Sequence, residues 1–264
     1  MKHPPPIMKP VPRETLWRIT MTFTEFYDHA QRVFDKNPSL PQLTKEKAEK
    51  LFELTTHMLE VNKNLNLTAI KDEKAVISKH YADSLMVNQY IDTNSTVIDI
   101  GCGAGFPTLP LAIFREDLTI TAVDSTAKRI NYVQSTARML GLDNVTAIAA
   151  RAEDMANSSQ YREKFDYATA RAVASLPILT ELCLPFVRID GKFIAMKSQK
   201  AADEISASQN AITKCGGVLK NAIEVPLVDV DGTFENRTLV HIAKTSKTPK
   251  EFPRHYSKIS KKPL

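Results

Sequence analysis

The chain is poor in cysteine and glycine, and it contains no long apolar run. Its three cysteines stand at positions 102, 183 and 215 of 264 residues. An odd count with these spacings fits neither a disulfide framework nor a zinc site. The six histidines show no metal-ligand spacing either. We therefore expect reduced thiols, no metal and a cytoplasmic location.

Membrane and export signals are also missing. No segment approaches the roughly 18 consecutive apolar residues that a membrane-spanning helix needs. Residues 1–20 contain five prolines and lack the apolar core of a signal peptide. We expect no membrane association, and we interpret residues 1–21 as a disordered or non-native lead.

From residue 96 onward, apolar runs alternate with amphipathic stretches. The expected strands are 96–100, 119–123, 145–149, 165–170 and 192–197, and the expected helices are 107–114, 126–140, 175–186 and 200–214. This alternation predicts an α/β fold with a mostly parallel, doubly wound sheet. The last two apolar runs, 218–228 and 237–243, have no helix between them. We expect them to form an antiparallel hairpin at the edge of a sheet of about seven strands.

Helical patterns precede this region, at 23–35, 44–62 and 72–88. The predicted organisation is therefore a lead (1–21), an N-terminal helical cap (22–92), an α/β domain (93–244) and a basic C-terminal tail (245–264).

Positive charge is concentrated at the C-terminal end. The net charge is +5, and residues 244–264 hold seven lysines and arginines against one glutamate. This pattern favours a polyanionic partner, with a solvated, disordered terminus as the alternative. Phe252, His255 and Tyr256 lie between the charges and would suit stacking on RNA bases.

Three of the eight glycines, Gly101, Gly103 and Gly105, follow the strand 96–100. A strand that ends in a glycine-rich turn before a helix accommodates a nucleotide in doubly wound sheets. Phe106 occupies the position of the third glycine of a dinucleotide fingerprint, and a P-loop ending is missing. The remaining G-x-G-x-G pattern, with Asp99 in the strand, suits a ligand without phosphate: S-adenosylmethionine. A plain tight turn is the alternative.

Two further positions extend this candidate site. Asp124 ends the strand 119–123, where a carboxylate can accept both ribose hydroxyls; capping of the next helix is the alternative. Ala152 and Glu153 follow the strand 145–149 and can read the adenine amine, unless they merely begin a surface helix.

Arg171 ends the strand 165–170 and could hold a phosphate, a base edge or the cofactor carboxylate, with a surface ion pair as the alternative. Lys197 and His80 are substrate-side candidates, although His80 also fits a buried core position. The chain lacks the D/N-P-P-Y/F motif of amino-methylating enzymes and a Pro-Cys nucleophile. An acceptor with a ready lone pair, such as guanine N7, needs no general base, because alignment and desolvation suffice. We therefore assign no catalytic residue.

Several short motifs occur together in order. They are Asn64–Thr68, Lys79-His80 with Asp83-Ser84-Leu85, Gly101–Pro107, Arg151–Asp154, Thr169–Val173 and the ending Phe252-Pro253-Arg254 with Lys261–Leu264. Over about residues 22–264 the chain resembles the bacterial 16S ribosomal RNA guanine-N7 methyltransferases, the glucose-inhibited division protein B family. Three positions depart from the family pattern: Thr108 replaces a usual glycine, and Ser257 and Ile259 replace the usual glycine and proline.

The resemblance implies a class I S-adenosylmethionine-dependent methyltransferase fold and a monomeric cytoplasmic enzyme. Its substrate would be N7 of one guanosine in the decoding region of 16S rRNA, in naked RNA or in the 30S subunit. By position, the family's cofactor contacts fall on Gly101, Phe106, Ala152, Glu153 and Arg171. The candidate RNA contacts in the tail are Arg254, Lys258, Lys261 and Lys262. The rival interpretations are a small-molecule methyltransferase and a non-catalytic RNA-binding assembly factor.

Overall fold

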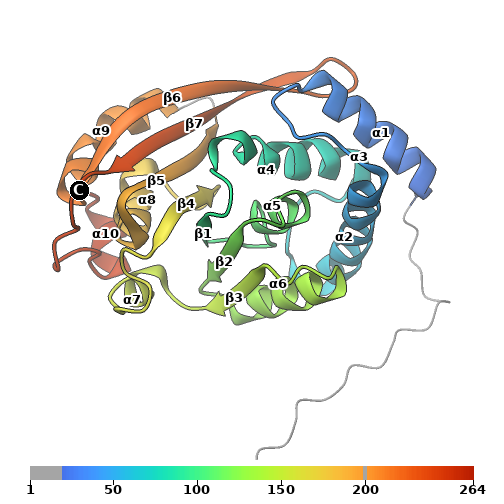
Figure 1. The fold of residues 1–264 in the computed structure, drawn as a ribbon. Coiled ribbons are helices and arrows are strands. Elements are labelled where there is room, and N and C mark those ends of the chain that lie inside the picture. Colours follow the sequence, from blue (N-terminus) through green and yellow to red (C-terminus); the bar gives the residue numbers. More distant parts are fainter. Residues whose placement is uncertain (1–19, 199–200) are drawn as a thin grey trace, which may run out of the picture.

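Seven strands form one sheet in the order β3-β2-β1-β4-β5-β7-β6 (Figure 1). The computed structural model describes residues 20–198 and 201–264. The strands are β1 Thr96–Ile100, β2 Thr119–Asp124, β3 Val145–Ala149, β4 Phe165–Arg171, β5 Val187–Ser198, β6 Gly217–Val228 and β7 Phe234–Lys244. Neighbouring strands are parallel from β3 to β5, whereas β7 is antiparallel to both β5 and β6. The predicted doubly wound sheet with an antiparallel last hairpin is confirmed.

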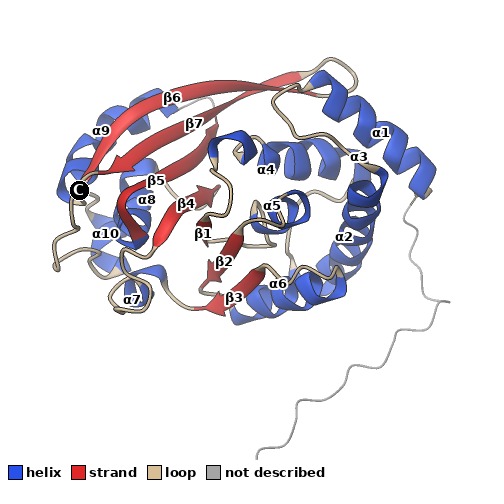
Figure 2. Cartoon of the chain, in the orientation of Figure 1, coloured by secondary structure: helices blue, strands red, loops and turns tan. Residues whose placement is uncertain are grey.

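Alternate residues of the strands face two separate cores. Val97 and Ile120 belong to one core, which the N-terminal helices, α5 and α6 cover. Ile98 and Phe193 belong to the other, under α7, α8, α9 and α10 (Figure 2). The helices are α1 Phe23–Lys36, α2 Lys45–Leu65, α5 Thr108–Phe114, α6 Ala127–Met139, α7 Ala152–Met155, α8 Leu176–Cys183, α9 Ala201–Lys214 and α10 Tyr256–Lys261, with 3-10 turns at Asn88–Tyr90 and Leu184–Phe186.

The N-terminal helices begin where the sequence indicates. Thr22 and Glu25 form a capping box at α1, and the Thr44 hydroxyl accepts from the Lys47 amide at α2. The helix predicted at 72–88 is instead divided into α3 Glu73–Val76, the π-helix η2 Ile77–Ala82 and α4 Asp83–Leu85. A π-helical stretch shifts the faces of a helix and is frequent at functional sites. Here it carries His80 and directly precedes Asp83.

The β6–β7 hairpin is longer than predicted and reaches over to the end of α1 (Figure 1). Lys36 Nζ donates to the Val230 carbonyl (2.9 Å), and Asn37 Nδ2 donates to that of Val228 (2.8 Å). Most of the predicted lead, residues 1–19, lies outside the described residues; Thr20 donates to Glu73 of α3 (2.8 Å). Within the described part of the chain, no helix is long and apolar enough to cross a membrane.

Candidate active site

The turn after β1 requires glycine. Gly101 has a φ of +74°, and a Cβ there would lie 2.5 Å from Val173 Cγ2. Only glycine fits such a position without a shift of its neighbours. The Gly103 amide donates to Asp124 Oδ2 (3.1 Å), which ties the turn to the end of the neighbouring strand.

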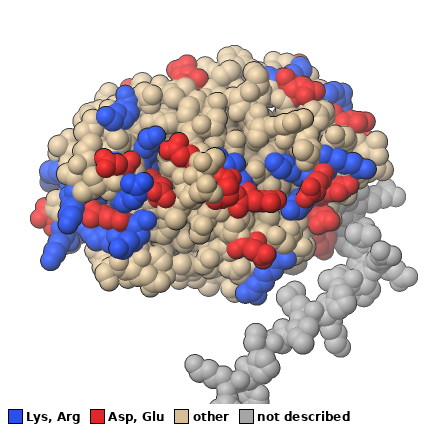
Figure 3. All heavy atoms as spheres, viewed as in Figure 1, with Lys and Arg blue, Asp and Glu red and all other residues tan. Residues whose placement is uncertain are grey.

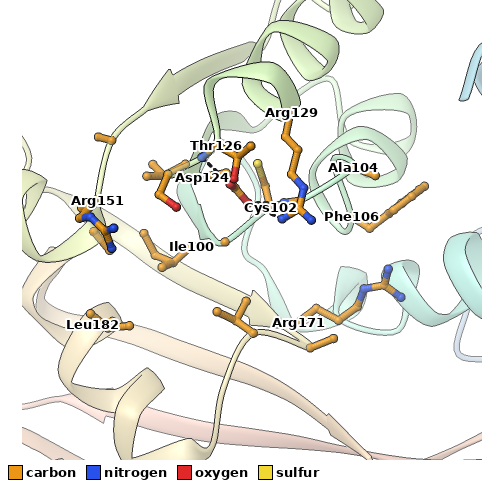
Figure 4. A pocket seen from close by; sticks show the side chains of 18 of the residues that line it. Ile100, Cys102, Ala104, Phe106, Asp124, Thr126, Arg129, Arg151, Arg171 and Leu182 are labelled. Atoms are coloured by element: carbon orange, nitrogen blue, oxygen red, sulfur yellow. Dashed lines mark hydrogen bonds and ion pairs between the residues drawn. The ribbon is translucent and has the colours of Figure 1, made fainter. Parts of the chain in front are cut away.

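A cavity of about 500 Å³ opens at the carboxyl ends of β1 to β4 (Figure 4). This volume lies in the range of small-molecule sites, about 300–1,000 Å³. Gly105 shapes the turn behind the cavity, with Leu109 packed against its Cα. The predicted residues that line the cavity are Gly101, Gly103, Phe106, Asp124, Ala152, Glu153, Arg171 and His80.

Asp124 is buried at the end of β2 and faces the cavity; it does not cap α6, whose N-cap is Thr126, but closes the turn before that helix. Its Oδ1 accepts from the Thr126 amide (2.8 Å), and Arg129 Nη1 lies 3.7 Å from Oδ2. Figure 4 shows the Arg129 side chain beside Asp124 and Cys102. A carboxylate held in this way still has lone pairs for the two hydroxyls of a ribose.

Glu153 is buried at the start of α7, beyond the end of β3. Its Oε1 accepts from the Tyr256 amide (3.3 Å), and Tyr256 also lines the cavity. The carboxylate and the exposed backbone of the α7 start can read the edge of a base.

On the opposite side of the cavity, three planar side chains are in contact: His80, Phe106 and Arg171. The His80 ring lies 4.4 Å from the Phe106 ring at an interplanar angle of 12°. The Arg171 guanidinium lies 5.4 Å from the centre of the Phe106 ring. Thr68 Oγ1 lies 2.8 Å from His80 Nε2, and Arg171 Nη2 lies 3.3 Å from His80 Nδ1. Burial, together with the charge of Arg171, lowers the pKa of His80 to about 4, so the imidazole is neutral at physiological pH.

An ion-pair network connects Arg171 of this cluster to strand β7. Arg171 Nη1 donates to Asp83 Oδ2 (2.6 Å), and Arg237 Nε of β7 donates to Asp83 Oδ1 (2.8 Å). All three side chains are largely buried. Asp83 therefore joins the N-terminal helices, β4 and β7 next to the cavity-lining Arg171.

Asp99 lies in β1 directly before the glycine turn. It accepts hydrogen bonds from the hydroxyls of Thr108 (2.7 Å) and Thr169 (3.3 Å). Burial raises the pKa of its carboxyl to about 6, although both hydroxyls oppose the shift.

The remaining predicted residues are engaged elsewhere or face solvent. Lys197 donates to the Ala174 carbonyl (2.9 Å) and pairs with Glu204 (2.7 Å). Arg254 pairs with the buried Glu181 (2.6 Å). The three tail lysines are exposed: Lys258, Lys261 and Lys262.

The sequence patterns did not indicate that Arg129 and Tyr256 line the cavity or that Asp83 pairs with Arg171. Asp83 and the cavity-lining Thr68 were part of the motifs that carry the family resemblance, although no role was assigned to either. Arg129 stands in an ordinary amphipathic helix, so its spacing carries no signal.

The lining contains the kinds of group that S-adenosylmethionine needs: two carboxylates, Asp124 and Glu153, and the guanidinium of Arg171. The strand order with its reversed β7 and this site define a class I S-adenosylmethionine-dependent methyltransferase. Residues 47–227 match the family model of GidB, rRNA small subunit methyltransferase G, and the chain belongs to this family.

Curated relatives agree with this assignment. Ribosomal RNA small subunit methyltransferase G of Clostridium perfringens (strain 13) is 42% identical over 84% of this chain and 93% of the relative. The protein of the same name from Alkaliphilus metalliredigens is 43% identical over 78% and 86%. A solved structure of a SAM-dependent methyltransferase from Aquifex aeolicus is 16% identical over 64% of this chain and 93% of that chain, with a TM-score of 0.48.

Proposed function

We propose that the chain transfers the methyl group of S-adenosylmethionine to N7 of one guanosine in the decoding region of 16S rRNA. The bound cofactor supplies an electrophilic methyl group on its sulfonium. The family membership supports this proposal. The cavity supports it too, because one end holds groups suited to the cofactor and the N-terminal helical region forms the other end.

In this proposal the chain's residues bind and orient the cofactor. Gly101 and Gly103 allow close approach of the backbone, and Asp124 accepts the ribose hydroxyls. Ala152 and Glu153 read the adenine. Arg171 pairs with the cofactor carboxylate, and Phe106 packs against both Arg171 and His80. Gly105 sets the course of the turn.

The observation that best supports the proposed chemistry is the neutral protonation state of His80. Among the described residues that line the cavity, it is the one imidazole, and both of its nitrogens face partners. With a pKa of about 4 it is a weak base at neutral pH. This environment suits an acceptor such as guanine N7, from which no proton has to be removed. Alignment and exclusion of water would then supply the acceleration.

The RNA-facing residues in this proposal are His80, which lines the cavity, and the exposed lysines of the basic segment, Lys258, Lys261 and Lys262. Lys197 and Arg254 pair with Glu204 and Glu181, so we no longer propose them as RNA contacts. We also propose the division into a helical cap (22–92), a methyltransferase domain (93–244) and a basic segment (245–264), with a monomer acting on the 30S subunit or its rRNA.

The test is methyl transfer from labelled S-adenosylmethionine to 30S subunits or 16S rRNA that lack the modification, followed by nucleoside analysis. We expect 7-methylguanosine, and no label on rRNA that already carries it. The single-turnover rate should be nearly constant between pH 6 and 9. A different methylated nucleoside, or a rate that rises tenfold per pH unit, contradicts the proposal.

A further inference from the structure

The C-terminal segment, residues 245–264, is attached to the rest of the protein by several polar contacts. The Arg162 guanidinium donates to the carbonyls of Thr248 (2.8 Å), Pro249 (3.0 Å) and Phe252 (3.0 Å). Fully buried Glu181 of α8 accepts from Arg254 Nε (2.8 Å) and Nη2 (2.6 Å). Such bidentate, charge-assisted bonds fix geometry as well as position.

This attachment brings Tyr256 to the cofactor cavity. The Tyr256 amide is bound to Glu153 (3.3 Å), and its side chain keeps 37% of its surface exposed. Asp124 ends β2, and Glu153 lies beyond the end of the neighbouring strand β3, so a base attached to a ribose at Asp124 would extend toward Glu153 and Tyr256. Figure 4 shows the apolar side chains of Ile100 and Leu182 at this end of the cavity. A partly exposed ring there is placed to cover one face of a flat base.

The other side of the same segment carries positive charge. Lys258, Lys261 and Lys262 are exposed, and no ion pair involves them within residues 20–198 and 201–264. Buried Ile259 fixes the rotation of α10, so these lysines point away from the core. Basic side chains gather at this end of the molecule, next to the C-terminus (Figure 3).

We propose that Tyr256 forms the adenine-side wall of the cofactor cavity, and that residues 245–264 thereby couple cofactor binding to rRNA binding. The RNA half of this inference rests on the proposed function. Because the segment touches both ligands, either ligand can hold it in the position that binds the other. Such coupling is reciprocal: each ligand raises the affinity for the other by the same factor.

The first experiment needs no RNA. Calorimetric titration with S-adenosylhomocysteine compares the unchanged protein with Tyr256→Ala and Tyr256→Phe, each checked for folding by thermal unfolding. We expect Tyr256→Ala to weaken binding about five- to tenfold, at the low end for a base–aromatic stack, because the ring is partly exposed. Tyr256→Phe keeps the stack and should bind as the unchanged protein does. Equal affinity in a folded Tyr256→Ala protein overturns the inference.

The second experiment measures the coupling. The affinity for S-adenosylhomocysteine is determined with and without saturating 30S subunits, and we expect a gain of about fivefold or more. Tyr256→Ala should abolish the gain. The triple variant Lys258→Gln, Lys261→Gln and Lys262→Gln should leave the affinity without subunits unchanged and reduce the salt dependence of subunit binding by about two log units per log of salt. Independent binding of the two ligands overturns the coupling. Intact binding and coupling without 7-methylguanosine would instead overturn the proposed reaction alone.

Discussion

At the scale of single residues, the site depends on carboxylates whose partners come from distant parts of the chain. The sequence identified Asp99 as an acid inside a buried strand, but its two hydroxyl partners were not predicted. Thr169 is 70 residues away in the sequence. Thr108 stood out in the sequence only because the family usually has glycine at this position. That departure supplies the shorter of the two hydrogen bonds to the buried carboxyl. Partners of this kind follow from the strand register, which single-sequence patterns do not give.

The raised pKa of Asp99 gives a pH dependence with a definite sign. Because the folded pKa is about 6 and the ordinary value is 3.8, the unfolded chain releases the proton first as pH rises. Stability from this group is therefore greatest below about pH 4, falls through pH 4–6 and stays low above that. Relative to Asp99→Asn, which cannot ionise, the unchanged protein should lose on the order of 3 kcal/mol across this window. Denaturant unfolding at several pH values measures the difference; parallel curves for the two proteins would contradict the shift.

Asp124 was predicted from its position at a strand end, with ribose binding and capping as open alternatives. The structure contradicts the capping alternative, since the N-cap of α6 is Thr126, and Asp124 accepts from the Thr126 amide in the turn before the helix. The ribose contact stays a prediction. Asp124→Asn can keep the turn bond through its amide oxygen, yet it loses the charge. We expect this variant to bind S-adenosylhomocysteine about tenfold more weakly, because hydrogen bonds to charged groups contribute about 1.5–3 kcal/mol. Unchanged affinity would leave Asp124 with a role in the turn only.

At the scale of elements, every predicted strand is present, because the short apolar runs are separated by clear breaks. The predicted helix at 72–88 shows where the pattern fails. Its apolar spacing continues without a Gly or Pro, so nothing in it distinguishes a regular helix from one that contains the π-helix η2. The segment's distortion is tertiary in origin: it holds Asp83 against Arg171 and Arg237 at the junction of three elements.

This junction allows a test of Arg171 that separates ligand contact from general damage. If the guanidinium pairs with the cofactor carboxylate, Arg171→Gln should weaken binding of S-adenosylhomocysteine about tenfold. Binding of 5′-methylthioadenosine, which lacks the amino-acid part, should stay the same. Arg237→Gln is the matched control, since it removes the other arginine of Asp83 and should leave both affinities unchanged. An equal loss for both ligands in Arg171→Gln would show that the arginine acts on the fold alone.

At the scale of the whole molecule, the N-terminal helical region and residues 245–264 complete the site that the central sheet begins. The composition of residues 245–264 predicted a basic tail, with a solvated, disordered terminus as the alternative. Within the described residues, its helix is the short α10. The attachment was not predictable, since Arg162 and Glu181 lie about 70 to 90 residues earlier and look like ordinary surface charges in the sequence.

Removing the ion pair between Arg254 and Glu181 tests how strongly residues 245–264 contribute to the stability of the fold. Arg254→Ala leaves a fully buried carboxylate without its cation and should lower the free energy of unfolding by about 3 kcal/mol, near the low end for buried pairs because Arg254 is partly exposed. The double variant Arg254→Ala and Glu181→Gln removes the uncompensated charge and should recover part of this loss. Lys258→Ala, on the exposed side of α10, should change stability by less than about 0.5 kcal/mol. Chemical denaturation of the four proteins measures these differences. If Arg254→Ala unfolds like the Lys258 control, the segment is loosely attached, and the position of Tyr256 at the cavity loses its support.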